Sequence, residues 1–215
     1  MTSLSAQINV VPGSARQVAP GAEARLNVLL NNPAMVQPAI ILPLGRNWFR
    51  MEKDSHVFTD KVSVQQVSAV LHDLDNHADI FNGRRAIMSS SVVSWGINEA
   101  IVDLTIISAG PLGIRIRTPY RLQVNTFENT NSRVYIEMKQ LESDSETNDR
   151  IKNFFGMRYV AEVIIDGKSY TYIRIYNVDD VNGRFLPGAR SVFENEIPPT
   201  SIEALNLIIA SALKR

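Results

Sequence analysis

The sequence feature that most constrains the fold is a hairpin centred on Asp166-Gly167. Two runs rich in β-branched and aromatic residues, 158–165 and 168–178, flank this dipeptide. Asp-Gly is typical of the two-residue type I′ turn, whose positive φ angles match the twist of paired strands. The predicted register pairs Ile165 with Lys168, Val163 with Tyr170, Ala161 with Tyr172 and Tyr159 with Arg174 on one face, and Ile164 with Ser169, Glu162 with Thr171, Val160 with Ile173 and Arg158 with Ile175 on the other.

Much of the remaining chain shows the apolar–polar alternation of strands. It predicts strands at 120–126 and 133–139, which form a second hairpin around 128–132. Further strands are predicted at 40–44, a short apolar run, and at 86–95 and 99–107, which are rich in Val, Ile, Ser and Thr. Pro119 is expected to break the strand before it, and Asn177–Gly188 to form a turn-rich excursion. The pattern therefore predicts a mainly β protein, an antiparallel β-sandwich or jelly-roll-like core with two or three appended α-helices.

Three segments are predicted to be helical. In residues 60–75, four apolar residues recur at spacings of three and four, after a candidate N-cap at Thr59 or Asp60. A short helix is expected near 147–155, ended by Gly156. A C-terminal helix is expected over 200–213, after Pro198-Pro199.

The N-terminal 6–32 stretch contains an alternating run at Ile8–Val10, a Pro-Gly turn and a second alternating run at Glu23–Leu30. This arrangement resembles the first two strands of many immunoglobulin-like sandwich domains, although no Cys-Trp-Cys core follows. The resemblance implies a sandwich edge and assigns no family. We expect one domain over 1–215, and the alternative is a division near 109–111 into parts 1–109 and 112–215.

Composition excludes several functional classes. The chain of 215 residues is 45% hydrophobic and 20% charged, which is ordinary for a globular protein rather than a disordered one. Lys+Arg and Asp+Glu number 22 each, so no global field attracts nucleic acid or acidic lipid. The lack of cysteine excludes disulfides and thiolate sites. With no secretion signal and no membrane-length apolar run, the chain is expected to be made in the cytoplasm, not secreted, and without a membrane span.

No motif predicts catalysis, a cofactor or a metal. The His72–Asp79 stretch is rich in histidine and aspartate, but it matches neither a zinc-protease helix nor a calcium loop, and a solvated helix end explains it better. A nucleophile elbow, a phosphate-binding loop and a dinucleotide fingerprint are all missing. We therefore predict a non-enzymatic protein with no cofactor. The alternative is an enzyme with an unmarked carboxylate site.

The alternating tyrosines and arginine of residues 170–176 favour the hypothesis of a nucleic-acid or partner contact. Aromatic residues that share a sheet face with arginine can stack on bases, while further arginines contact phosphates. The candidate contact residues for a nucleic acid or another partner are Tyr170, Tyr172, Arg174, Tyr176, Arg115 and Arg117. The alternative interpretation is that the tyrosines pack in the core.

The C-terminal helix supplies the other candidate contact. Its apolar face is formed by Ile202, Leu205, Ile208 and Ile209. This face either docks on its own sheet or inserts into a neighbouring copy. From these features we predict a structural or assembly protein of a viral or phage particle (capsid, tail or matrix-like layer) that is incorporated in a virion. Its expected partners are copies of itself or other particle proteins. The second prediction is a nucleic-acid or peptide binding module.

Overall fold

The computed structural model describes residues 13–83, 87–109, 115–141, 151–185 and 189–215. The strands are β1 (Ala34–Met35), β2 (Ile40–Gly45), β3 (Trp48–Thr59), β4 (Ile87–Trp95), β5 (Glu99–Ala109), β6 (Arg115–Asn129), β7 (Arg133–Gln140), β8 (Ile151–Ile165) and β9 (Lys168–Asn182). The helices are α1 (Leu26–Leu29), α2 (Val64–His72), α3 (His77–Ile80) and α5 (Ala189–Ala212). Short 3₁₀ turns are η1 (Gly13–Arg16), η2 (Glu23–Arg25), η3 (Leu74–Asn76) and η5 (Gly183–Phe185).

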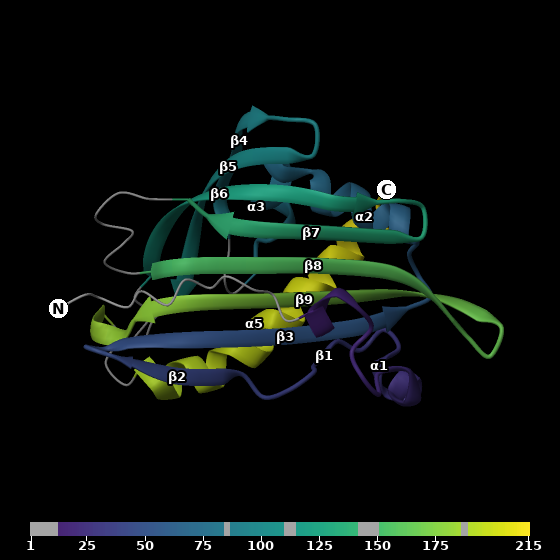
Figure 1. Ribbon diagram of the computed structural model, residues 1–215, viewed down its shortest axis with the longest axis horizontal. Helices are drawn as coiled ribbons and strands as arrows, with labels where there is room; N and C mark the ends of the chain where they lie inside the picture. The colour runs from purple at the N-terminus through teal and green to yellow at the C-terminus, as the bar shows by residue number, and fades with distance from the viewer. Residues whose placement is uncertain (1–12, 84–86, 110–114, 142–150, 186–188) are drawn as a thin grey trace.

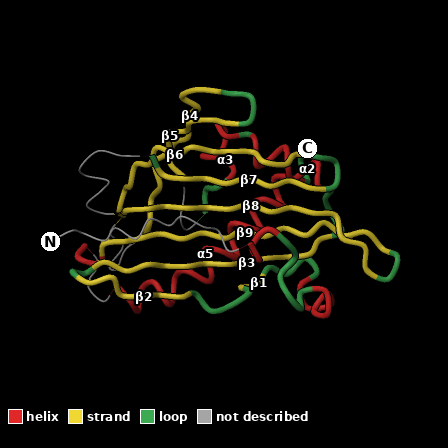
Figure 2. The backbone as a smooth tube through the Cα atoms, in the orientation of Figure 1, coloured by secondary structure: helices red, strands yellow, loops and turns green. Residues whose placement is uncertain are grey.

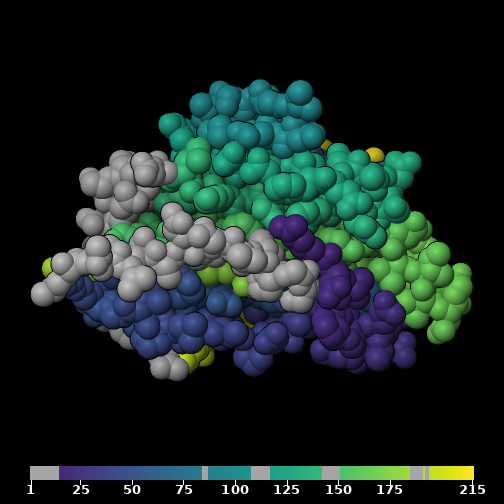
Figure 3. Space-filling model, in the orientation of Figure 1, coloured from purple at the N-terminus to yellow at the C-terminus, as the bar shows by residue number. Residues whose placement is uncertain are grey.

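The strands form one antiparallel sheet of nine strands in the order β1-β3-β9-β8-β7-β6-β5-β4, with β2 beside β3. Helices α2, α3 and α5 lie behind this sheet in Figure 1, and we call the face that they cover the inner face. The N-terminal segment, residues 13–36, lies on the opposite, outer face (Figures 1 and 3). A mainly β fold with a few helices is thus confirmed. The predicted sandwich or jelly-roll is not confirmed. The described strands form a single sheet, and helices rather than a second sheet cover its inner face.

The central hairpin is confirmed residue by residue. Every predicted pair between β8 and β9 is present, and the turn residues Asp166 and Gly167 have φ angles of 51° and 77°. The β6–β7 hairpin forms where alternation predicts it, and β4 and β5 form where the composition favours strands. Figure 2 shows these strands as neighbouring yellow stretches of the backbone tube.

The N-terminal resemblance to a sandwich edge is wrong for the described residues. Glu23–Leu30 forms η2 and α1 instead of a strand, because one side of this turn packs against the sheet: Leu29 is fully buried, whereas Val28 is 58% exposed. Ile8–Val10 lies outside the described residues.

The helix boundaries also differ from the prediction. Helix α2 begins after Ser63, whose side chain forms a capping box with Gln66, and not after Thr59 or Asp60. Residues 151–155 belong to β8 rather than to a short helix, while 147–150 lie outside the described residues. Helix α5 begins at Ala189 and continues through both prolines of the pair Pro198-Pro199, which were expected to precede it.

Two predicted breaks are parts of strands. Asn177–Asn182 extends β9, so the expected excursion is reduced to η5, and 186–188 lie outside the described residues. Pro119 lies within β6 opposite Thr105 of β5. The β6–β7 pairing reaches only Leu122, so Pro119 has a described strand neighbour on one side, which suits a residue without an N–H.

The sheet separates two hydrophobic cores. The inner core joins α2 and α5 to the sheet through residues such as Val67, Leu205 and Ile208. The outer core joins the N-terminal segment to aromatic residues of β8 and β9, among them Tyr172. Residues 110 and 111 of the alternative domain boundary lie outside the described residues.

Candidate functional site

A cavity of about 160 Å³ lies on the inner face, between the sheet and helices α2, α3 and α5. Most of its wall is apolar. The apolar lining residues include Leu71 and Leu74 from the helical side and Leu104, Leu122, Val124, Ile136, Met138, Phe154 and Ile175 from the strands. The inner core is therefore incompletely filled, which is unusual because protein interiors pack as densely as organic crystals.

The polar groups of the cavity gather where β3, β9 and β8 lie side by side. Lys53 and Ser55 come from β3, Asn177 from β9 and Arg158 from β8. Lys53 is the register partner of Asn177, and Ser55 and Arg158 both pair with Ile175. Long-range strand pairing thus brings together residues that are more than a hundred positions apart in the chain.

Arg158 is the most distinctive of these groups. Its Nη1 donates to the carbonyl of Met157 and to Oδ1 of Asn177, each at 2.9 Å. Burial lowers the pKa of Arg158 to about 10, against the opposing field of Asp179. The guanidinium therefore remains charged at neutral pH.

Arg158 is half-buried, whereas a second cation, Lys53, forms an ion pair with Asp179 in which both side chains are almost wholly buried. Oδ1 of Asp179 has no hydrogen-bond partner among the described residues. This carboxylate is thus committed to Lys53, and the two charges of the pair cancel.

Gly156 makes room for this arrangement. A Cβ placed at this position would lie 2.9 Å from Oδ1 of Asn177 and 3.1 Å from Cζ of Phe154. Real Cβ atoms essentially never show the first of these contacts, and the second would require Phe154 to shift by a few tenths of an ångström. The glycine that was expected to end a helix instead lets Asn177 and Phe154 approach the strand.

The two histidines of the His72–Asp79 stretch have separate environments. Nδ1 of His72 lies 2.9 Å from the carbonyl of Ser68, and its Nε2 lies 3.1 Å from the hydroxyl of Thr126. His77 is buried at the cavity wall, and its Nε2 has no partner within the described ranges. Burial, followed by the charge of Arg158, lowers the pKa of His77 to about 4, so this imidazole is neutral at pH 7. The described part of the chain contains no group of three or more metal-type ligands.

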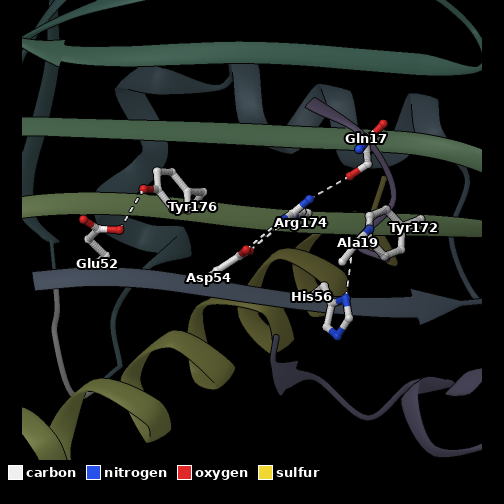
Figure 4. A network of polar contacts seen from close by, with 8 residues as sticks. All are labelled: Gln17, Ala19, Glu52, Asp54, His56, Tyr172, Arg174 and Tyr176. Atoms are coloured by element: carbon white, nitrogen blue, oxygen red, sulfur yellow. Dashed lines mark hydrogen bonds and ion pairs between the residues drawn. The ribbon is translucent and has the colours of Figure 1, made fainter. Parts of the chain in front are cut away.

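The tyrosine and arginine stripe of β9 lies on the outer face, away from the cavity. Ala19 N–H donates to the hydroxyl of Tyr172 at 3.0 Å, and Nδ1 of His56 lies 3.0 Å from the same hydroxyl (Figure 4). Arg174 donates to both oxygens of Asp54, at 2.9 and 2.5 Å, and to the carbonyl of Gln17 at 2.9 Å. The N-terminal segment is thereby fixed to the sheet.

The remaining stripe residues, Tyr170 and Tyr176, are 9% and 8% exposed, and Tyr172 is fully buried. Arg117 is exposed on β6, which β7 and β8 separate from β9, and the side chain of Arg115 lies outside the described side chains. The arrangement does not bring these arginines beside the stripe. A nucleic-acid contact stays a prediction, and the burial supports the alternative interpretation of core packing.

The apolar face of the C-terminal helix packs within its own chain. Leu205, Ile208 and Ile209 belong to the inner core, and Ile202 is half-buried. The end of α5 is held to α2 by a hydrogen bond from Gln66 Nε2 to the carbonyl of Ala212 at 3.3 Å. An ion pair between Arg215 and Asp73 adds a second tie at this end.

Sequence analysis named none of the cavity's polar residues as a site. One signal was available: the hairpin register places Arg158 on the same face as Val160, Ile173 and Ile175. An arginine on an apolar strand face indicates either a buried charge or a solvated edge. Lys53 and Asp179 carried no comparable signal, because their proximity depends on the β3–β9 pairing.

Comparison with known proteins addresses the fold. No protein-family model matches the chain, and no curated protein matches it. Solved structures do. The Zhui aromatase/cyclase from Streptomyces sp. R1128 is similar with a TM-score of 0.56 at 16% identity, covering 77% of this chain and 95% of that one.

Two further structures share the arrangement. Human STARD10 has a TM-score of 0.57 at 10% identity, over 82% of this chain and 74% of that one. A STAR-related lipid transfer protein from Xanthomonas axonopodis has a TM-score of 0.56 at 11% identity, over 83% of this chain and 100% of that one. At such identities the similarity shows the fold alone.

These similarities overturn the prediction of a viral or phage particle component. One of the similar structures is named as an aromatase/cyclase and another as a lipid transfer protein, and none of the three is named as a virion protein. Within the described ranges, none of the helices has the length and apolar character needed to cross a membrane. The chain has the helix-grip fold, in which one antiparallel sheet and a long C-terminal helix enclose an inner cavity.

Proposed function

We propose that this protein binds a small, mainly apolar molecule in the cavity between the sheet and helices α2, α3 and α5. The observation that carries the proposal is the unfilled inner core, about 160 Å³ in volume, with an apolar wall and a few polar groups on one side. Pockets of this composition are the usual sites for small ligands. A dry apolar cavity of about 150 Å³ can bind benzene, so the volume suits a ligand of roughly one or two aromatic rings.

The similar structures agree with this proposal. One of them is named as a lipid transfer protein and another as an aromatase/cyclase. We favour binding without catalysis for this chain. A general base works best with a pKa near the working pH, whereas the pKa of His77 is about 4.

We also propose that residues 1–215 act as one domain. The cavity lining supports this: it includes Lys53 and Leu104 from before the alternative boundary at 109–111, and Arg158 and Ala204 from after it. Self-association stays a prediction that solution mass would test, and the proposed binding does not require it.

The experiment that tests the proposal fills the cavity. Ala204 lines it from α5, so Ala204→Phe should occupy the ligand volume, whereas Ala210→Phe places the same ring on the exposed side of the same helix. Isothermal titration calorimetry with 2-naphthylmethanol should show binding to the unchanged protein and to Ala210→Phe. The affinity of Ala204→Phe should be at least about tenfold lower, since roughly 1.4 kcal/mol of lost contact suffices for that change.

Circular dichroism must show that both variants remain folded. Equal affinity for both variants, or no binding to the unchanged protein, would contradict the proposal. Mass spectrometry of the recovered ligand completes the test. We expect the ligand to return chemically unchanged, and a product of altered mass would contradict binding without catalysis.

A further inference from the structure

We infer that the ligand carries a carboxylate, and that Arg158 binds this group at the side of the cavity formed by β3, β9 and β8. The inference rests on the proposed function and specifies the chemical class of the ligand. It assigns a polar end and an apolar end to the bound molecule.

The first observation is an unbalanced positive charge. Buried charges in proteins are normally paired, because removing a charge from water is costly. Lys53 is paired with Asp179. Arg158 forms hydrogen bonds only to neutral oxygens, those of Met157 and Asn177, and has no ion pair among the described residues.

The second observation concerns hydrogen-bond donors. A guanidinium has five N–H donors, and the two bonds of Arg158 both start from Nη1. Its Nε and Nη2 therefore keep donors without a partner in the described part of the chain. A carboxylate matches such donors with two parallel hydrogen bonds. The cavity lining around Arg158 also includes the amide of Asn177 and the hydroxyl of Ser55.

The third observation is the electrostatic environment. Burial lowers the pKa of Arg158, and Asp179 is the carboxylate whose field opposes this effect. Asp179 already forms an ion pair with Lys53, so one carboxylate faces two cations and one positive charge is left without a countercharge among the described residues. The charge of Arg158 contributes to lowering the pKa of His77, and this histidine is neutral at pH 7. His77 therefore supplies no countercharge to Arg158. An anionic ligand group would supply it.

The apolar wall of the cavity determines the chemical character of the part of the ligand that does not contact Arg158. Away from Arg158, the wall consists of apolar side chains such as Leu104, Leu122 and Ile136. An apolar ring or chain would pack there while the carboxylate faces β8. The ligand class is thus a small amphipathic acid.

Two probes of equal shape test the inference: 2-naphthoate, which is anionic at pH 7.5, and neutral 2-naphthylmethanol. Hydrogen bonds to charged groups contribute about 1.5–3 kcal/mol, so calorimetry should show at least about tenfold tighter binding of 2-naphthoate. Arg158→Met should remove this preference and leave the affinity for 2-naphthylmethanol within about twofold. Arg158→Lys should restore part of it, while Arg121→Met, which changes an exposed pair with Asp103, should have no effect.

The outcomes distinguish a failure of the carboxylate inference from a failure of the proposed function. If 2-naphthylmethanol binds at least as tightly as 2-naphthoate, the carboxylate inference is wrong and the proposed function stands. The same conclusion follows if folded Arg158→Met keeps the preference for the acid. If neither probe binds, both are wrong. The comparison of probes on the unchanged protein holds even if Arg158→Met does not fold.

Discussion

The two faces of the sheet bury similar groups and differ in how completely those groups are satisfied. On the outer face, Arg174 donates to both oxygens of Asp54 and to the carbonyl of Gln17. On the inner face, the described partners of Arg158 are two neutral oxygens, and the residue lines an unfilled volume. The outer face is a closed packing interface, whereas the inner face has an unfilled volume and, among the described residues, donors of Arg158 without a partner. Burial of an arginine alone therefore does not mark a site, whereas donors without a described partner beside an unfilled volume do.

The largest expected effect tests how closed the outer face is. Asp54→Ala removes the carboxylate partner of Arg174, whose side chain is 5% exposed. Breaking a buried pair typically costs 3–5 kcal/mol, so we expect the free energy of unfolding to fall by about that amount in urea titrations. The control is Asp103→Ala, which breaks the exposed pair with Arg121 and should cost about 0–1 kcal/mol. Equal losses from the two variants would show that the outer pair is not a structural anchor.

A second prediction compares one histidine from each face. Burial lowers the pKa of both His56 and His77 from about 6.5 to about 4. Between these values the unfolded chain binds more protons than the folded one, so the stability that each neutral histidine contributes is present above pH 6.5 and lost as pH falls towards 4. The expected slope is at most about 1.4 kcal/mol per pH unit for each histidine, up to roughly 3 kcal/mol in total for each.

Urea unfolding at several pH values from 7 to 4.5 measures this slope, and His56→Gln and His77→Gln should each remove about half of it. A flat profile in the unchanged protein would contradict the account for both faces. If only His77→Gln reduces the slope, the outer face is more hydrated than its contacts indicate.

The sequence predicted the parts of this fold that depend on neighbours in the chain. The Asp166-Gly167 turn and the alternation on both sides of it gave the register of β8 and β9, because a two-residue turn leaves no freedom in pairing. Alternation around a polar loop also located β6 and β7, and residues that favour strands located β4 and β5. The capping box at the start of α2 was missed by only a few residues, since Thr59, Asp60 and Ser63 are all good caps.

Other elements depend on partners that are distant in sequence. The alternation in Glu23–Leu30 is compatible with a strand, but packing on the outer face selects short helical turns that bury Leu29. Gly156 was interpreted as a helix end, whereas its role is to admit Asn177 from the neighbouring strand. Local propensity is overridden in both places by contacts across the sheet.

The candidate site was the least predictable part. The stripe of tyrosines on β9 attracted a binding hypothesis because aromatic alternation is visible in the sequence. Its burial depends on the N-terminal segment, which the alternation does not show. The cavity exists because helices and strands from distant parts of the chain leave a volume unfilled between them. No residue type or local pattern in the sequence indicates such a volume.

The measurement that tests the central claim most directly is methyl NMR during titration with 2-naphthoate. The account predicts large shift changes for methyl groups around the cavity, such as those of Leu122, Ile136 and Ile175, and small changes for Leu29 and Val178 of the outer core. Changes confined to the outer core, or saturable binding with no change at the cavity methyl groups, would contradict the assignment of the ligand site to the inner face.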